Sequence, residues 1–207
     1  MKLIGTKDQI QLGSINTSRK ELIDIIKAWA AISLAFAILL GGSTLSFNLI
    51  SLFTIAGLSV GFGFIAHELA HKVVAQRYGC KAEFRSFDQM LILAVVMSFF
   101  GFILAAPGAV MISGPVGKKR NGKISSAGAI ANLIVAAGFL SLLFIPVTGT
   151  LLLIAKYGFM INTWLALFNL IPVWMFDGKK VLNWSKPVYF TLLGISMIFM
   201  ALNSILG

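Results

Sequence analysis

A run of twenty-two residues without a charged side chain, Leu45 to Ala66, leads directly into His67-Glu68-Leu69-Ala70-His71. The run is long enough to cross a bilayer and indicates one long helix from Leu45 to about Tyr78. Positions i and i+4 share a helix face, so both imidazoles can bind one metal ion. Glu68 lies one position round and can act as general base on a water at that ion. The alternative is a chance pattern, or histidines that only hydrogen-bond inside a helix bundle.

The remaining apolar runs show that this helix is one of several. The chain is 58% hydrophobic over 207 residues and has a mean hydropathy of +0.92. A soluble domain of this size cannot bury so much apolar surface, which predicts an all-α polytopic membrane protein with five to six transmembrane helices. The net charge of +10 comes from basic residues that flank the apolar runs. This placement is typical of orientation in a bilayer and argues against nucleic acid as a partner.

We expect a single membrane-embedded domain over residues 1–207, with a cytoplasmic N-terminus at 1–24 and a catalytic core at 45–185. A short strand is possible at Gln9–Leu12. Besides the motif helix, the predicted spans are Ile25–Leu40, Ile124–Ile145 and Leu151–Trp174. A loop at Asp177–Pro187 then precedes a last span that ends near Leu206.

Sixteen of the seventeen basic residues fall into four short segments. The positive-inside rule places all four in the cytoplasm, so we expect a multi-pass protein of the cell membrane whose N-terminus and active-site end are cytoplasmic. Residues 88–114 must then return to the side they left, although two full crossings need about 40 residues. We therefore predict a re-entrant segment that can contain β structure, with bends near Gly101, Pro107 and Gly114. The alternative is an ordinary third span that violates the charge rule.

The third metal ligand follows by elimination, because the chain has no further histidine. A catalytic zinc usually has three protein ligands and one open position. Of the seven acidic residues, three precede the first predicted span, Glu68 is the proposed base, and Glu83 and Asp88 are expected to be solvated among basic residues. Asp177 remains, at the cytoplasmic end of its helix and at a depth similar to that of the histidines. The alternatives are Glu83, Asp88 or the sole cysteine, Cys80, with Asp177 only a helix-end residue.

Two motifs together resemble the site-2 protease family of intramembrane zinc metalloproteases. They are His67-Glu68-Leu69-Ala70-His71 and Asn169-Leu170-Ile171-Pro172, the latter followed by Asp177-Gly178. A third segment, Gly128-Ala129-Ile130-Ala131-Asn132, is similar to the family's glycine-proline-x-x-asparagine helix start. The resemblance covers residues 55 to 185. It departs from the family pattern at Ala129, Met175 and Lys179, and it includes no PDZ insertion.

The resemblance implies that His67, His71 and Asp177 bind Zn²⁺ and that Glu68 activates water for peptide-bond hydrolysis. It also implies that Asn169 assists at the active site and that β elements after the motif helix receive substrate. Asn169 or Asn132 could donate a hydrogen bond to the oxyanion, or each could simply bond to a neighbouring helix. The expected partners are a transmembrane protein substrate and the lipid bilayer. The oligomeric state is left open.

Three other functions fit part of the pattern. A catalytically inactive pseudoprotease that binds membrane helices would not need the intact Glu68 and Asp177. A zinc carrier or channel would show further ligands along a path, whereas both histidines are used at one site. A zinc peptidase of another fold would typically use a downstream Glu or His as its third ligand, and only Asp177 fits here.

Overall fold

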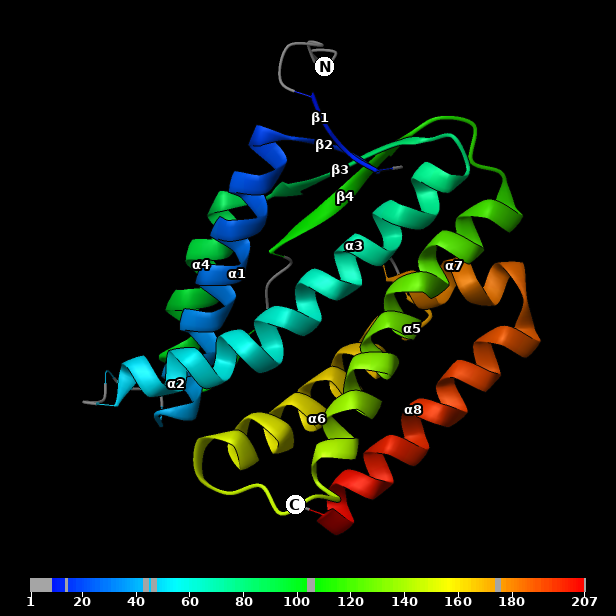
Figure 1. Cartoon of the computed structure of the whole chain (residues 1–207). Helices are drawn as coiled ribbons and strands as arrows, with labels where there is room; N and C mark the ends of the chain where they lie inside the picture. Colours follow the sequence, from blue (N-terminus) through cyan, green and yellow to red (C-terminus); the bar gives the residue numbers. More distant parts are fainter. Residues whose placement is uncertain are drawn as a thin grey trace.

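Five long apolar helices form the bundle in the computed structural model, which describes residues 9–13, 15–42, 45, 48–103, 107–173 and 176–206 (Figure 1). The helices that are long and apolar enough to cross a membrane are α1 (Arg19–Leu40), the continuous segment Leu49–Arg77, α5 (Lys118–Leu142), α6 (Gly149–Asn169) and α8 (Lys186–Leu206). Large apolar side chains also cover the outside of the bundle, as at Ile50, which is 84% exposed, and Phe144, which is 76% exposed. A surface of this kind requires lipid around it. The chain is an all-α polytopic membrane protein, as predicted.

Several predicted boundaries shift. Helix α1 begins six residues before the predicted Ile25, because Ser18 caps it by accepting a hydrogen bond from the Glu21 backbone N–H. Helix α6 ends at Asn169, shortly before Pro172, which cannot continue a helix. The predicted loop at Asp177–Pro187 is wrong, because most of it forms helix α7 (Asp177–Trp184). The predicted strand Gln9–Leu12 is confirmed as β1, paired with β2 (Ile15–Ser18). Residues 1–8, Ser14, 43–44, 46–47, 104–106, Trp174, Met175 and Gly207 lie outside the described part of the chain.

The motif helix is nearly the single helix predicted, but it contains a π-helical turn. Helix α2 (Leu49–Ala56) passes through the π-helix at Gly57–Gly61 into α3 (Phe62–Arg77). Neighbouring helices bond to carbonyls of this wider turn: Trp29 Nε1 donates to Gly57 O at 3.1 Å, and Asn162 Nδ2 donates to Ser59 O at 3.2 Å. Such turns often lie at functional sites. Here the turn fixes α3 against α1 and α6.

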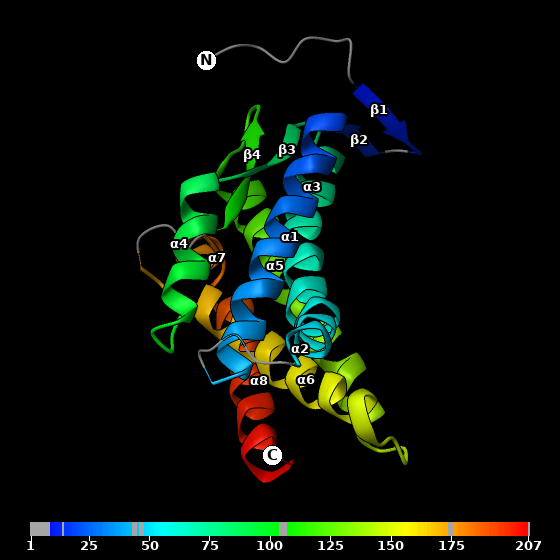
Figure 2. The same ribbon diagram turned by 90° about the vertical axis from the view of Figure 1, so that its left-hand side faces the viewer.

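The segment 88–114 descends and returns, as expected. Helix α4 (Asp88–Ser98) has eleven residues and is therefore about 16 Å long, too short to cross a bilayer. After it, β4 (Gly108–Ser113) pairs antiparallel with β3 (Lys81–Ser86), which precedes α4. Figure 2 shows α4 beside α1 and β4 back at the end of the bundle where β3 lies. An ordinary third span is therefore wrong, while entry of the segment into lipid stays a prediction.

A buried ion pair joins the two-stranded β3–β4 sheet to the motif helix; we call this sheet the β3–β4 hairpin, although α4 connects its two strands. Lys72 and Glu21 are 1% and 0% exposed, and Lys72 Nζ lies 2.6 Å from Glu21 Oε2. Glu21 Oε1 accepts a hydrogen bond from the Phe84 backbone N–H at 2.8 Å, so the same carboxylate holds β3. The expectation that Glu83 is solvated is wrong, because Glu83 is buried and pairs with Arg85.

Asp88, by contrast, is exposed as expected and pairs with Lys27. The hydrogen bonds from Lys27 and Ser86 hold the pKa of the Asp88 carboxyl below its usual value. The sole cysteine, Cys80, is buried in the small core between α3, α5 and the hairpin.

Candidate metal centre

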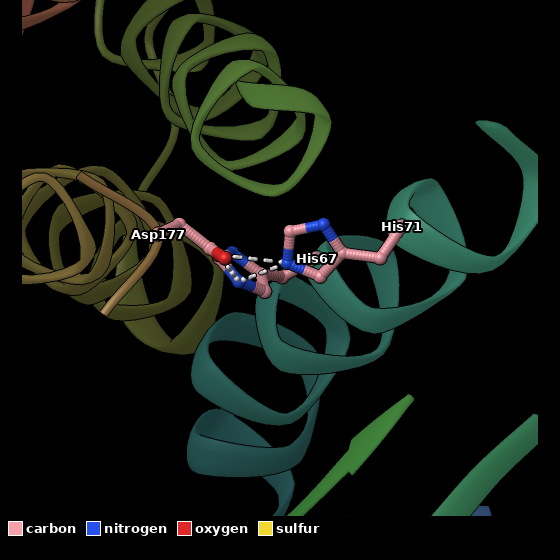
Figure 3. A group of neighbouring side chains, drawn as sticks. All are labelled: His67, His71 and Asp177. Carbon is pink, nitrogen blue, oxygen red and sulfur yellow. Dashed lines mark hydrogen bonds and ion pairs between the residues drawn. The ribbon is translucent and has the colours of Figure 1, made fainter. Parts of the chain in front are cut away.

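Three side chains from two distant parts of the chain meet between α3 and the start of α7 (Figure 3). His67 Nε2 and His71 Nε2 lie 3.0 Å apart on α3. Asp177 Oδ2 lies 2.9 Å from the Nε2 atom of His71 and 3.6 Å from that of His67. All three side chains are almost fully buried. The structure thus brings together the three predicted ligands.

This geometry fits a tetrahedral metal ion. Zinc bonds of 2.0–2.1 Å place neighbouring ligand atoms about 3.3 Å apart, which falls within the observed range. His71 Nδ1 donates to the Ile124 backbone carbonyl at 2.8 Å, which leaves the lone pair of Nε2 directed at the carboxylate oxygen. Two acceptors this close require a cation between them, either a proton or a metal ion. Two imidazoles and one carboxylate are a donor set that zinc takes.

Glycine at position 128 allows α5 to approach the two imidazoles. A Cβ added to Gly128 would lie 2.5 Å from His71 Nε2 and 2.5 Å from His67 Cε1. Any side chain there would occupy the space between α5 and the ligands. This close approach also places the Ile124 carbonyl, one turn earlier on α5, against His71.

Asp177 owes its position to the sequence around it. It is the first residue of α7, where a carboxylate interacts favourably with the helix dipole. A Cβ at Gly178 would overlap the Leu170 backbone, so only glycine lets α7 begin against the end of α6. Burial raises the pKa of the Asp177 carboxyl, but hydrogen bonds and charges of His67 and His71 outweigh burial and hold its pKa well below the usual range. The second oxygen, Oδ1, accepts a hydrogen bond from Lys180 Nζ at 3.3 Å. The carboxylate is therefore ionised, and its Oδ2 could bind a metal ion together with the two imidazoles.

Glu68 follows His67 on α3 and turns toward the hairpin. The backbone N–H of Val110 in β4 faces its carboxylate. The proposed base therefore lies between the ligand pair and strand β4.

The two asparagines differ in their surroundings. Asn132 lies one turn beyond Gly128 on α5, is 0% exposed, and has no hydrogen-bond partner for its amide N or O among the described residues. The interhelical bond considered for Asn132 is therefore not seen. Asn169 ends α6 and donates to the Leu165 carbonyl of its own helix at 2.9 Å. Within the described part of the chain, no hydrogen bond joins Asn169 to His67, His71 or Asp177.

Sequence reasoning missed the roles of Ile124 and Lys180, and it noted Gly128 only as part of a motif, without its close approach to the imidazoles. A backbone carbonyl such as that of Ile124 leaves no sequence signal. Lys180 could have been found from its i+3 spacing to Asp177, had residues 177–184 been predicted as a helix.

A protein of Methanocaldococcus jannaschii that bears the name "putative zinc metalloprotease" is 39% identical to this chain over 184 residues. The match covers 87% of this chain and 92% of the relative. No family model matches the chain, and no solved structure matches it.

Proposed function

Because this chain belongs to the protein family of that archaeal relative, we propose that it is an intramembrane zinc metalloprotease similar to the site-2 proteases. It would be an endopeptidase that hydrolyses peptide bonds in or near transmembrane segments of other proteins. The observation that carries the proposal is the buried group of His67, His71 and Asp177, whose ligand atoms lie within 4.8 Å of one another inside a bundle of membrane-spanning helices.

The chemistry divides between the metal and the side chains. His67, His71 and Asp177 would hold the zinc ion, which would supply a water of lowered pKa and a positive charge for the scissile carbonyl. Glu68 accepts the proton of the attacking water and returns it to the leaving amine. Asn132, buried and without a partner one turn from Gly128, is the better placed of the two asparagines to donate to the oxyanion.

The substrate must present extended backbone, since a helix satisfies its own carbonyls. Side chains occupy the outer edge of β3: Gln76 Nε2 donates to Ala82 O, and Glu21 accepts from the Phe84 N–H. Strand β4 forms the other edge of the hairpin, and its Val110 N–H faces Glu68. We place the unwound substrate along β4 by strand addition, next to the base.

The orientation follows from charge. Apart from Lys156, the basic residues of the described part of the chain lie toward the end of the bundle nearer the candidate metal centre, so the positive-inside rule puts this end and the N-terminus in the cytoplasm of a cell. Water for hydrolysis would enter from that side.

Replacement of the base tests the proposal. We expect purified Glu68→Gln protein to keep its zinc and to lose cleavage of labelled single-span peptides in detergent micelles. The matched control is Asp88→Asn, which neutralises an exposed acid outside the metal centre and should cleave as the wild type does. Persistent cleavage by the Glu68→Gln protein would remove Glu68 as the base. Absence of zinc from the purified wild-type protein would rule out the proposed metalloprotease function.

A further inference from the structure

A group of exposed basic side chains surrounds the end of the bundle that carries the metal centre. We call this group the basic rim: Arg77, Lys118, Lys119, Arg120, Lys123 and Lys179. They come from α3, α5 and α7, the three helices that bring together the ligands and Gly128 (Figure 1).

The basic rim lies close to the ligands along each helix. Arg77 is six residues beyond His71, about 9 Å at 1.5 Å per residue, and Lys179 is two residues beyond Asp177. Lys123 directly precedes Ile124, whose carbonyl binds His71. The guanidinium of Arg120 lies over the Tyr78 ring, 5.6 Å from its centroid. The start of α5 is therefore next to the end of α3.

Nothing neutralises the basic rim within the described residues. None of its six members forms an ion pair there. The carboxylates at this end of the bundle pair with other cations. The pairs are Glu21 with Lys72, Asp24 and Asp88 with Lys27, Glu83 with Arg85, and Asp177 with Lys180. The basic rim therefore keeps a positive field around the approach to the metal centre.

We propose that the basic rim selects substrates by the charge of the flank next to their membrane-spanning segment, favouring acidic flanks and rejecting flanks rich in lysine or arginine. This selection rests on the proposed protease function. Opposite charges speed encounter and like charges oppose it. Most membrane segments carry lysine or arginine at their cytoplasmic end, so the basic rim would exclude the majority of them and admit a minority.

The probe is a set of leucine-rich single-span peptides that differ only in one flank, made of glutamates, glutamines or lysines. Binding to the Glu68→Gln protein in zwitterionic detergent measures selection without catalysis, and cleavage by the wild type measures it with catalysis. We expect the glutamate flank to be favoured over the lysine flank by about tenfold or more at low salt. The ratio should shrink as salt screens the charges.

Two variants separate the basic rim from the overall charge. Lys118→Gln/Lys119→Gln/Lys123→Gln removes three charges from the basic rim, and Lys156→Gln removes one from α6, outside the four basic segments. The flank ratio should fall toward one in the triple variant and stay at the wild-type value in Lys156→Gln.

Equal binding of all three flanks, or an unchanged ratio in the triple variant, would overturn the selection. If binding depends on the flank and no peptide is cut, the basic rim stands as a binding surface and the protease function fails. If all peptides are cut equally well, the protease function stands and the selection fails.

Discussion

The Lys72 ammonium and the Glu21 carboxylate form an ion pair inside the bundle, 2.6 Å apart. Lys72 directly follows His71, one of the three predicted metal ligands. Lys72 shares a face of α3 with Glu68 and Gln76, at spacings of four residues. All three reach the β3–β4 hairpin: Glu68 at Val110, Lys72 through Glu21 to Phe84, and Gln76 at Ala82. The buried pair thus holds the hairpin against the face of the motif helix that carries the proposed base.

Loss of one partner of this pair should be costly. Lys72→Met leaves the Glu21 charge buried and unpaired, so we expect the free energy of unfolding to fall by about 3–5 kcal/mol. Denaturant titration of the protein in mixed micelles measures it. Lys27→Met removes an exposed cation that pairs with Asp88 and with Asp24. Because Asp88 is exposed and Arg85 remains near Asp24, stability should fall much less than in Lys72→Met. The double variant Glu21→Met/Lys72→Met should regain most of the loss. Similar losses in Lys72→Met and Lys27→Met would show that the buried pair has no special weight.

The third ligand is tested by metal content. Wild-type protein purified in detergent should carry about one zinc per chain, as expected for a single three-ligand site. Asp177→Ala removes one of three ligands, and we expect a loss of zinc affinity above the 10–100-fold that an outer-shell partner costs. Elemental analysis and competition with a chelator measure both quantities. Asp88→Ala, an exposed acid near the same end of the bundle, should retain zinc. Full retention by Asp177→Ala would overturn the three-ligand site of His67, His71 and Asp177.

The close approach of α5 gives a matched pair of glycine variants. Ala at Gly128 would place its Cβ 2.5 Å from His71 Nε2, whereas Ala at Gly138 meets nothing within 4 Å. Both changes gain about 1 kcal/mol of helix propensity. We expect Gly138→Ala to be stabilised with its zinc retained, and Gly128→Ala to lose zinc because α5 or the imidazoles must shift. Equal zinc affinity in the two variants would contradict the close approach.

Gly63 and Asn162 should be energetically coupled. A Cβ at Gly63 would overlap the Asn162 side chain, so Gly63→Ala alone should destabilise the protein. Asn162→Ala alone removes the bonds to the Ser59 and Gly158 carbonyls. In the double variant the added methyl group occupies the space that Asn162 vacates. We expect a favourable coupling of about 0.5–3 kcal/mol in a double-mutant cycle, and additive effects would argue against the contact.

Much of this architecture could be predicted because lipid imposes strong rules. Long uncharged runs identified the spans, and the i, i+4 spacing put His67 and His71 on one face. Asp177 could be selected by elimination, because it was the only acidic residue at the depth of the histidines that had no other expected role. The structure places it next to the two imidazoles.

The errors arose where long-range packing decides the outcome. Glu83 looked like a surface residue among basic neighbours, but Arg85 allows it to be buried. Residues 177–184 look polar enough for a loop, yet the close contact of Gly178 with Leu170 starts a helix there. Neither contact can be read from nearby sequence, because the partners meet only once the bundle has formed.

The π-helical turn at Gly57–Gly61 contains a residue that a plain α-helix would not need. An α-helix rotates about 100° per residue, and a π turn holds one residue more than an α turn. Deletion of one residue from this turn would leave an α turn of nearly the same rotation, so the segment that carries His67 and His71 would still face α5. Trp29 and Asn162, however, would lose the carbonyls to which they donate in the wide turn. The extra residue therefore serves the attachment of this span to α1 and α6 and not the direction of its histidines.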